Sequence, residues 1–215
     1  MNPPDGTGFV ATEMQEGSER PKYLSSCCEY RHRGFFLTAA HTIRGLTRDH
    51  LYVACPSMTE YRQVDEVFAH PEADLAVLRM DAAEPMGAPF WGILGNPMWG
   101  DNAWAFGYIA HYTEYEALVP QGRLYPGYFQ RFFPREKDGC TYAAAEVTVG
   151  YPPGLCGAPV FRQHANTMLL GLVTGEDTME MGDRPLYRSG VCILLHPYEQ
   201  WIHSVVPAPG EDSDA

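Results

Sequence analysis

The 215-residue sequence lacks a long apolar run, an excess of basic charge and any extended helical pattern. Its first twenty residues carry several charges and no continuous apolar core, so neither a secretory leader nor a membrane span is visible. We therefore expect a soluble, cytoplasmic protein with no membrane partner. The formal net charge of −12 argues against nucleic acid as a partner, because a chain that repels phosphate lacks the dominant attraction in such binding.

The cysteines lack the spacing of a metal site, and none of them adjoins His41. They lie at positions 27, 28, 55, 140, 156 and 192. We expect reduced thiols, as in a reducing compartment, with no metal and no cofactor.

Turn-forming residues, in contrast, are plentiful: the chain holds 21 glycines and 18 prolines and is 45% hydrophobic. Short apolar or alternating runs recur between turn-rich segments, a pattern typical of an all-β protein. These runs cover residues 23–30, 51–55, 64–69, 103–107, 116–123, 143–147 and 168–174. Near the end, Trp201 and Val205 stand four residues apart, as on one face of a helix. An acidic tail, 207–215, is predicted to be flexible.

The segment 154–161 places the thiol of Cys156 in a glycine-flanked turn that leads into an apolar strand. Glycine permits a sharply turned backbone whose N–H groups converge on one point, and such donors form the oxyanion hole that acyl transfer requires. A buried structural cysteine fits the same run. The segment alone leaves both interpretations open.

Two further segments supply a candidate base and a group to orient it, which nucleophilic catalysis requires. His41 follows an apolar strand and two alanines, and Asp74 stands at the start of another apolar run. A buried carboxylate beside an imidazole would fix the tautomer of the ring. Each residue also has an ordinary structural interpretation, and a strand-initial aspartate is usually a turn residue.

The three segments resemble the T-A-A-H, D-L-A-V-L and G-x-S-G-x-P-V signatures of the chymotrypsin-like (trypsin-like) proteases, in the order His, Asp, nucleophile. Weaker similarities at 6–10, 171–175, 189–191 and 197–206 extend the resemblance over nearly the whole chain. It implies an all-β fold of two six-stranded antiparallel β-barrels with a short C-terminal helix. The first barrel would span 1–95 and carry His41 and Asp74, and the second would span 96–206 and carry Cys156.

The resemblance also implies functional roles. It predicts an endopeptidase with a triad of His41, Asp74 and Cys156, a covalent acyl-enzyme, and the backbone N–H groups of Gly154 and Cys156 as oxyanion donors. The residues expected around the substrate pocket are Gly150, Tyr151, Thr174, Gly175, Glu176 and Gly190. Because Gly150, at the predicted pocket floor, offers no carboxylate, we expect a small to medium substrate side chain rather than Arg or Lys, unless Glu176 reaches in.

The sequence departs from the family pattern at Cys156, where the family usually has Ser. Three interpretations follow: a native cysteine protease, a serine protease carrying a Ser-to-Cys change, or a catalytically silent peptide-binding module. The retained base and its orienting carboxylate favour an enzyme acting on a protein or peptide. Leu155, just before the nucleophile, offers no carboxylate to capture a newly cut N-terminus, so control would come from elsewhere, such as a regulatory protein partner.

Overall fold

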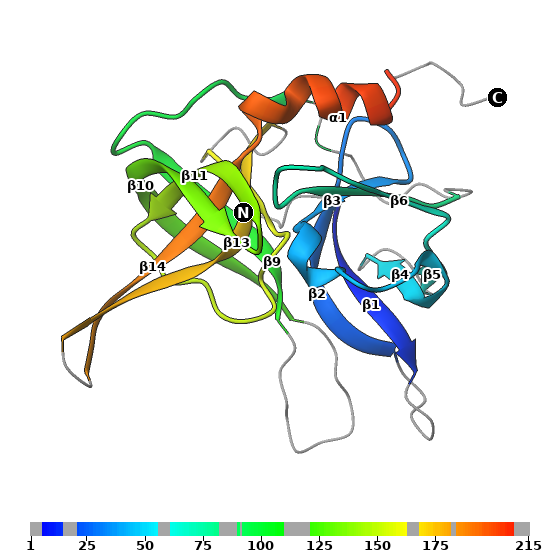
Figure 1. Ribbon diagram of the computed structural model, residues 1–215, viewed down its shortest axis with the longest axis horizontal. Coiled ribbons are helices and arrows are strands. Elements are labelled where there is room, and N and C mark those ends of the chain that lie inside the picture. The colour runs from blue at the N-terminus through cyan, green and yellow to red at the C-terminus, as the bar shows by residue number, and fades with distance from the viewer. Residues whose placement is uncertain are drawn as a thin grey trace.

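A computed structural model describes residues 6–14, 21–55, 61–81, 90, 92–109, 121–162, 168–181 and 184–208. Within these residues the protein is nearly all β, with two seven-stranded sheets side by side and one short α-helix, α1 (Glu199–Val205) (Figure 1). No helix in this part of the chain is long and apolar enough to cross a membrane.

The first sheet is built from the N-terminal part of the chain. Its strands are β1 (Thr7–Met14), β2 (Pro21–Glu29), β3 (Phe35–Thr38), β4 (Leu51–Ala54), β5 (Arg62–Gln63), β6 (Glu66–Ala69) and β7 (Ala76–Arg79). They lie in the order β5-β4-β1-β2-β3-β7-β6, and every neighbouring pair is antiparallel. Apolar side chains such as Val10, Phe36, Val53 and Leu78 fill one core of this sheet, which stabilises it by removing apolar surface from water.

The second sheet closes on itself. Its strands are β8 (Gly92–Ile93), β9 (Asn102–Ile109), β10 (Gln121–Lys137), β11 (Cys140–Val147), β12 (Pro159–Phe161), β13 (Met168–Met181) and β14 (Arg184–Leu194). The order is β12-β9-β10-β11-β14-β13-β8, and a further β12–β13 pairing closes a barrel around buried residues that include Ala105, Val147 and Val173. The strand β8 pairs parallel with β13, whereas Phe90, two residues earlier, bridges to Tyr30 of the first sheet.

The predicted all-β double barrel with a short C-terminal helix is confirmed, with a correction to the strand count. Among the described residues each sheet has seven strands rather than six, because the two-residue strands β5 and β8 extend an edge of each sheet. The expected run 116–123 is strand from Gln121 onward, and residues 116–120 lie outside the described part. Most of the predicted acidic tail, 209–215, also lies outside it.

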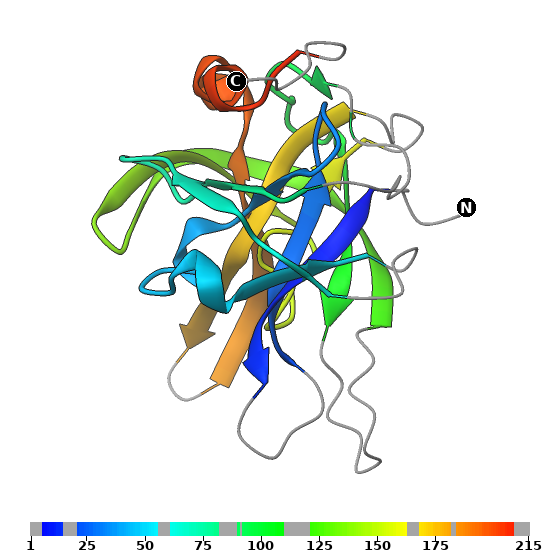
Figure 2. The same ribbon diagram turned by 90° about the vertical axis from the view of Figure 1, so that its right-hand side faces the viewer.

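The C-terminal segment lies across one end of the molecule in both views (Figures 1 and 2). This segment consists of a short 3-10 turn, η3 (His196–Tyr198), and the helix α1 that follows it. The Tyr198 hydroxyl accepts a hydrogen bond from the Ala143 N–H of β11 at 3.0 Å, and the His70 ring of the first sheet packs edge-on against Trp201 at 4.8 Å. The Tyr30 hydroxyl lies 3.1 Å from His203 Nε2. This segment therefore contacts both sheets.

Candidate active site

His41 is presented by the first sheet where a buried strand gives way to a tight turn. All four residues of β3 are buried, and the 3-10 turn η1 (Ala40–Thr42) follows directly. The Thr42 hydroxyl donates to the Ala39 carbonyl at 2.7 Å and so fixes the turn that carries the imidazole.

Asp74 holds this histidine with both carboxylate oxygens. It lies just before β7 and is almost fully buried. Its Oδ1 accepts the His41 backbone N–H at 2.8 Å, and its Oδ2 lies 2.7 Å from His41 Nδ1. Because a carboxylate only accepts hydrogen bonds, the proton must be on Nδ1, and the ring orientation is fixed.

Cys156 reaches the same imidazole from the second sheet. It lies in a turn between Gly154, at φ +92°, and Gly157, at φ +84°, conformations that favour glycine. Its side chain is partly exposed and lies close enough to His41 to raise the pKa of the imidazole. The structure thus brings His41, Asp74 and Cys156 together, with base and carboxylate from one sheet and the thiol from the other.

The pKa values of the pair respond to this arrangement. Burial acts to lower the pKa of His41, but hydrogen bonds to Asp74 and Cys156 outweigh it and raise the pKa to about 9. Burial acts to raise the pKa of Asp74, but the hydrogen bonds and charge of His41, with the charge of Lys137, lower it below its usual range. At neutral pH the imidazole therefore holds a proton and the carboxylate does not.

Two backbone N–H groups beside the thiol have no acceptor among the described residues, those of Gly154 and Cys156. The neighbouring donors are used: the Leu155 N–H bonds to the Pro152 carbonyl at 3.2 Å, and the Gly157 N–H bonds to Val173 at 2.8 Å. The two residues predicted as oxyanion donors therefore carry the two unpaired amides of this turn, which could bind an anionic oxygen.

The nucleophile turn rests on strand β2 of the first sheet. The Ser26 N–H donates to the Cys156 carbonyl at 2.9 Å, and the Thr38 hydroxyl donates to the Ser26 carbonyl at 2.9 Å. A Cβ atom at Gly157 would overlap that carbonyl oxygen, so only glycine permits this approach. Sequence reasoning missed Ser26, because nothing in its local sequence marks a contact with a turn 130 residues away.

Most of the predicted pocket residues come together beside this turn. Glu176 and Gly190 are register partners in the β13–β14 ladder, and Glu176 Oε2 would lie 3.5 Å from a Cβ at Gly150. The Glu176 carboxylate does reach the predicted floor, where it lies 3.8 Å from the Arg188 guanidinium. Tyr151 is buried and its ring fills the space over Gly190, so it backs this wall rather than lying open.

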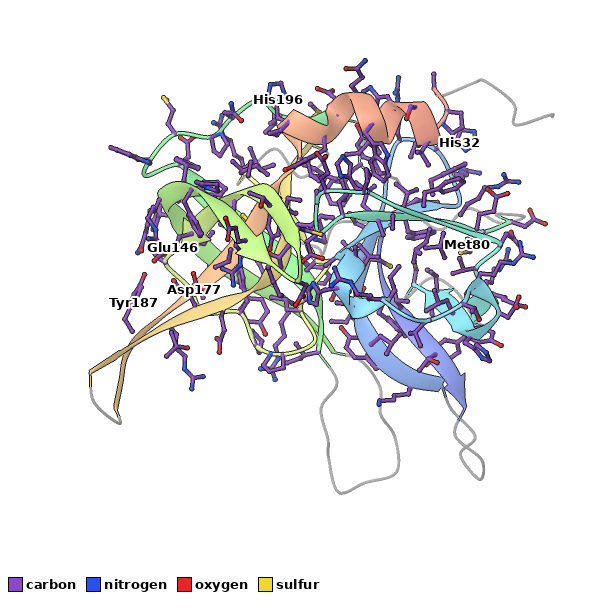
Figure 3. The ribbon with its side chains drawn as sticks, in the orientation of Figure 1. His32, Met80, Glu146, Asp177, Tyr187 and His196 are labelled. Atoms are coloured by element: carbon purple, nitrogen blue, oxygen red, sulfur yellow. The ribbon has the colours of Figure 1, made fainter. Side chains whose placement is uncertain are left out.

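The other two predicted pocket residues, Thr174 and Gly175, continue along β13. The Thr174 carbonyl accepts a hydrogen bond from Lys137 Nζ at 3.0 Å, a residue that sequence reasoning did not single out. On the same strand, Asp177 pairs with Arg135 at 2.9 Å, and Figure 3 shows Asp177 on the second-sheet side of the molecule. The cations of β10 therefore line this part of β13.

The cysteines and acidic residues form no other evident centre. All six thiols are free, and only Cys140 and Cys156 are not fully buried. Among the described residues, no group of His, Cys, Asp and Glu is arranged to hold a metal ion.

No protein-family model matches the sequence, and no curated protein matches it significantly. Several solved structures, in contrast, are similar to it. The active form of the Rv3671c protease from M. tuberculosis is similar with a TM-score of 0.69 at 13% identity, over 95% of this chain and 82% of that one. The MamO protease domain from Magnetospirillum magneticum has a TM-score of 0.69 at 17% identity, over 95% and 97%. A scabies mite inactivated protease paralogue, S-I1, has a TM-score of 0.69 at 16% identity, over 94% and 93%.

These similarities establish that the chain has the chymotrypsin-like fold of the trypsin-like proteases. At such low identity they speak to the fold alone. What the site does is inferred from its own geometry.

Proposed function

We propose that this protein is an endopeptidase that cleaves peptide bonds with Cys156 as nucleophile, His41 as acid and base, and Asp74 as the group that orients His41. The observation that carries the proposal is the position of the His41 imidazole, which bonds to a buried carboxylate and whose pKa is raised by the nearby Cys156 thiol of the opposite sheet. The unpaired N–H groups of Gly154 and Cys156 support it.

The proposed reaction proceeds through a covalent acyl-enzyme. The Cys156 thiolate forms a C–S bond to the peptide carbonyl carbon while the carbonyl π electrons move to oxygen, where the Gly154 and Cys156 N–H groups stabilise the charge. The C–N bond then breaks as the proton on His41 passes to the leaving amine. Water, deprotonated by His41, attacks the thioester and releases the acid and the thiol.

The protonation of His41 is what a thiol nucleophile requires, and Cys156 is itself one cause of the raised pKa. An imidazole with a pKa near 9 is protonated at neutral pH, which suits a thiolate nucleophile that needs an acid for the leaving amine. A serine hydroxyl would instead need an unprotonated imidazole to accept its proton.

For the substrate, we propose a protein or peptide with a small to medium side chain before the cleaved bond. The Tyr151 ring occupies the space over Gly190, and the Glu176 carboxylate over Gly150 is paired with Arg188 rather than left for a basic side chain. A library profile in which Arg or Lys dominates at the position before the cleaved bond would contradict this substrate preference. Because a partly exposed nucleophilic thiol is open to oxidation, we also propose a reducing compartment, the cytoplasm.

The deciding experiment is hydrolysis of a diverse peptide library, with reductant present, by the wild-type protein, Cys156→Ala and Cys156→Ser. We expect cleavage by the wild type, none by the Ala variant and weak cleavage by the Ser variant. A Ser variant much faster than the wild type would identify a serine protease carrying a Ser-to-Cys change. Peptide binding without cleavage by any form would favour the silent module and overturn the proposal.

A second measurement tests the activation of the thiol directly. We expect iodoacetamide to alkylate Cys156 faster than the other five cysteines at neutral pH, and His41→Ala to remove this advantage, since the imidazolium stabilises the thiolate. Mass spectrometry locates the modified residue, and the partly exposed Cys140 is the internal control. Equal rates at Cys156 and Cys140 in the wild type would contradict an activated nucleophile.

The silent peptide-binding module remains the second candidate. One similar structure is of a protein described as an inactivated protease paralogue, so this fold does occur without activity. Retention here of the buried carboxylate, the imidazole and the thiol in mutual contact favours the enzyme.

A further inference from the structure

Tyr23 extends from strand β2 of the first sheet to the turn that precedes the nucleophile. Its hydroxyl lies 2.6 Å from the Gly154 carbonyl oxygen, and its single proton is shared between that oxygen and the Tyr108 carbonyl of β9. Ser26 Oγ lies 3.2 Å from the same hydroxyl and accepts the Tyr108 N–H at 2.9 Å. One phenol group thus joins β2, β9 and the nucleophile turn.

The ring of Tyr23 also limits the shape of this turn. A Cβ atom at Gly154 would lie 3.0 Å from Tyr23 Cε1, closer than side chains normally pack, and Gly154 has the positive φ that favours glycine. The ring also packs against Phe9, with ring centroids 5.8 Å apart. The contacts with Phe9 and with the backbone of Gly154 therefore hold the Tyr23 ring in place.

The hydroxyl is a permanent donor. Burial raises the pKa of Tyr23 far above its ordinary value, because a phenolate there would be poorly solvated. Since carbonyl oxygens only accept hydrogen bonds, the contacts with Gly154 and Tyr108 both depend on this one proton, and the raised pKa keeps it on the hydroxyl at neutral pH.

The bond from Tyr23 acts on one particular peptide group. The carbonyl of Gly154 and the N–H of Leu155 belong to the same planar unit, and the Leu155 N–H is bonded to Pro152. Tyr23 holds one end of this plane and Pro152 the other. The plane lies between the two peptide groups that carry the unpaired N–H donors of Gly154 and Cys156, so its rotation decides whether those donors converge.

We propose that Tyr23 is a positioning residue for the oxyanion hole: by holding the Gly154 carbonyl, it keeps the amides of Gly154 and Cys156 aimed at one oxygen. This inference rests on the proposed peptidase function. Tyr23 touches no reacting atom in this scheme, and its effect passes through the backbone of the turn.

The test compares Tyr23→Phe, which keeps the ring and loses the hydroxyl, with Tyr30→Phe as the matched control. Tyr30 is a buried tyrosine that directly follows β2, and its hydroxyl bonds to His203, away from the turn. The probe is a peptide aldehyde with a small to medium side chain on the residue that carries the aldehyde group. Its carbon bonds to the Cys156 sulfur and its oxygen, taking the carbonyl electron pair and a proton from His41, occupies the oxyanion site.

For Tyr23→Phe we expect aldehyde affinity to fall about tenfold and kcat for a peptide amide to fall about 10- to 100-fold, less than the loss of a whole oxyanion donor. KM and the rate of Cys156 alkylation by iodoacetamide should stay within about twofold, because alkylation develops no oxyanion. Tyr30→Phe should match the wild type in all four measurements.

Wild-type aldehyde affinity in Tyr23→Phe would overturn the inference. So would a parallel loss of kcat and alkylation, which would place the effect on the thiol or on the fold. If the wild type binds the aldehyde but cleaves no peptide, the proposed function fails, while weaker aldehyde binding by Tyr23→Phe still supports the inference. If the wild type does not bind the aldehyde, both fail.

Gly154→Ala provides a second route should Tyr23→Phe not fold. The added methyl group would press on the Tyr23 ring from the side of the turn, so the same loss of kcat and aldehyde affinity with preserved alkylation is expected. Unchanged kcat in a folded Gly154→Ala protein would contradict the proposal.

Discussion

The proton on His41 sets the pH range of the proposed chemistry. Its partners, Asp74 and Cys156, raise the pKa of the imidazole to about 9 despite its partial burial. The ring is therefore an acid at neutral pH, ready to protonate a leaving amine once a thiolate has attacked.

We expect kcat/KM for a peptide amide to fall as pH rises through about 9, because deprotonation of His41 removes this acid. In Cys156→Ser, where unprotonated imidazole is needed, the rate should instead rise with pH across the neutral range. Initial rates measured on both proteins over the same pH series check this. A wild-type rate that keeps rising above pH 9 would show that His41 acts as a base toward a neutral thiol.

The residues of the candidate triad could be predicted from sequence because each follows or precedes an apolar run within a recognisable local motif. His41 ends one such run and Asp74 begins another. Tyr23 could not be found this way. Its contact with Gly154 spans 131 positions and exists only because the two sheets pack together, which no local pattern encodes.

At the scale of elements, the nucleophile turn depends on close contact with strand β2. The backbone of Gly157 approaches the Ser26 carbonyl and the Thr38 hydroxyl too closely for any side chain. This contact fixes how far the thiol lies from the imidazole.

Gly157→Ala should therefore lower the free energy of unfolding by about 1–3 kcal/mol through overpacking. It should also lower kcat at least about a hundredfold, because a small displacement of the nucleophile is costly. Gly100→Ala is the control, since Gly100 has a similar φ of +81° with open space around it. Urea unfolding and peptide turnover report the two effects. Equal loss of stability in both variants, with full activity, would show that the turn tolerates the methyl group.

The elements differed in how well their sequences predicted them. The buried strand β4 was predicted closely, whereas β13 was predicted only over its apolar first half, 168–174. The strand β10 was predicted only at its start, because beyond residue 123 it carries charged residues and two prolines, Pro126 and Pro134. Backbone pairing with β9 and β11, rather than its own composition, makes this segment a strand.

At the scale of the whole molecule, histidine contacts join the C-terminal segment to the N-terminal part of the chain. His70 contacts Tyr198 and Trp201, and His203 contacts Tyr30. Burial lowers the pKa of both imidazoles below the ordinary 6.5, although nearby Glu72 and Glu199 act in the opposite direction.

Stability should consequently fall in acid. Because the folded pKa of each histidine is lowered, the unfolded chain binds its proton more readily, so the stabilisation is complete above pH 6.5 and is lost as pH falls below it. Thermal unfolding across this range should show a shallower loss for His203→Gln than for the wild type. The matched variant His32→Gln, outside these contacts, should keep the wild-type slope; identical slopes in all three would contradict the assignment.

The division of the triad between two sheets has one more consequence. Since Cys156 belongs to one sheet and His41 to the other, the distance between the thiol and the imidazole depends on how the two sheets pack together. A ligand that separated the two sheets at a distant edge would stop peptide cleavage without touching a reacting atom. A ligand that held the two sheets together would restore it.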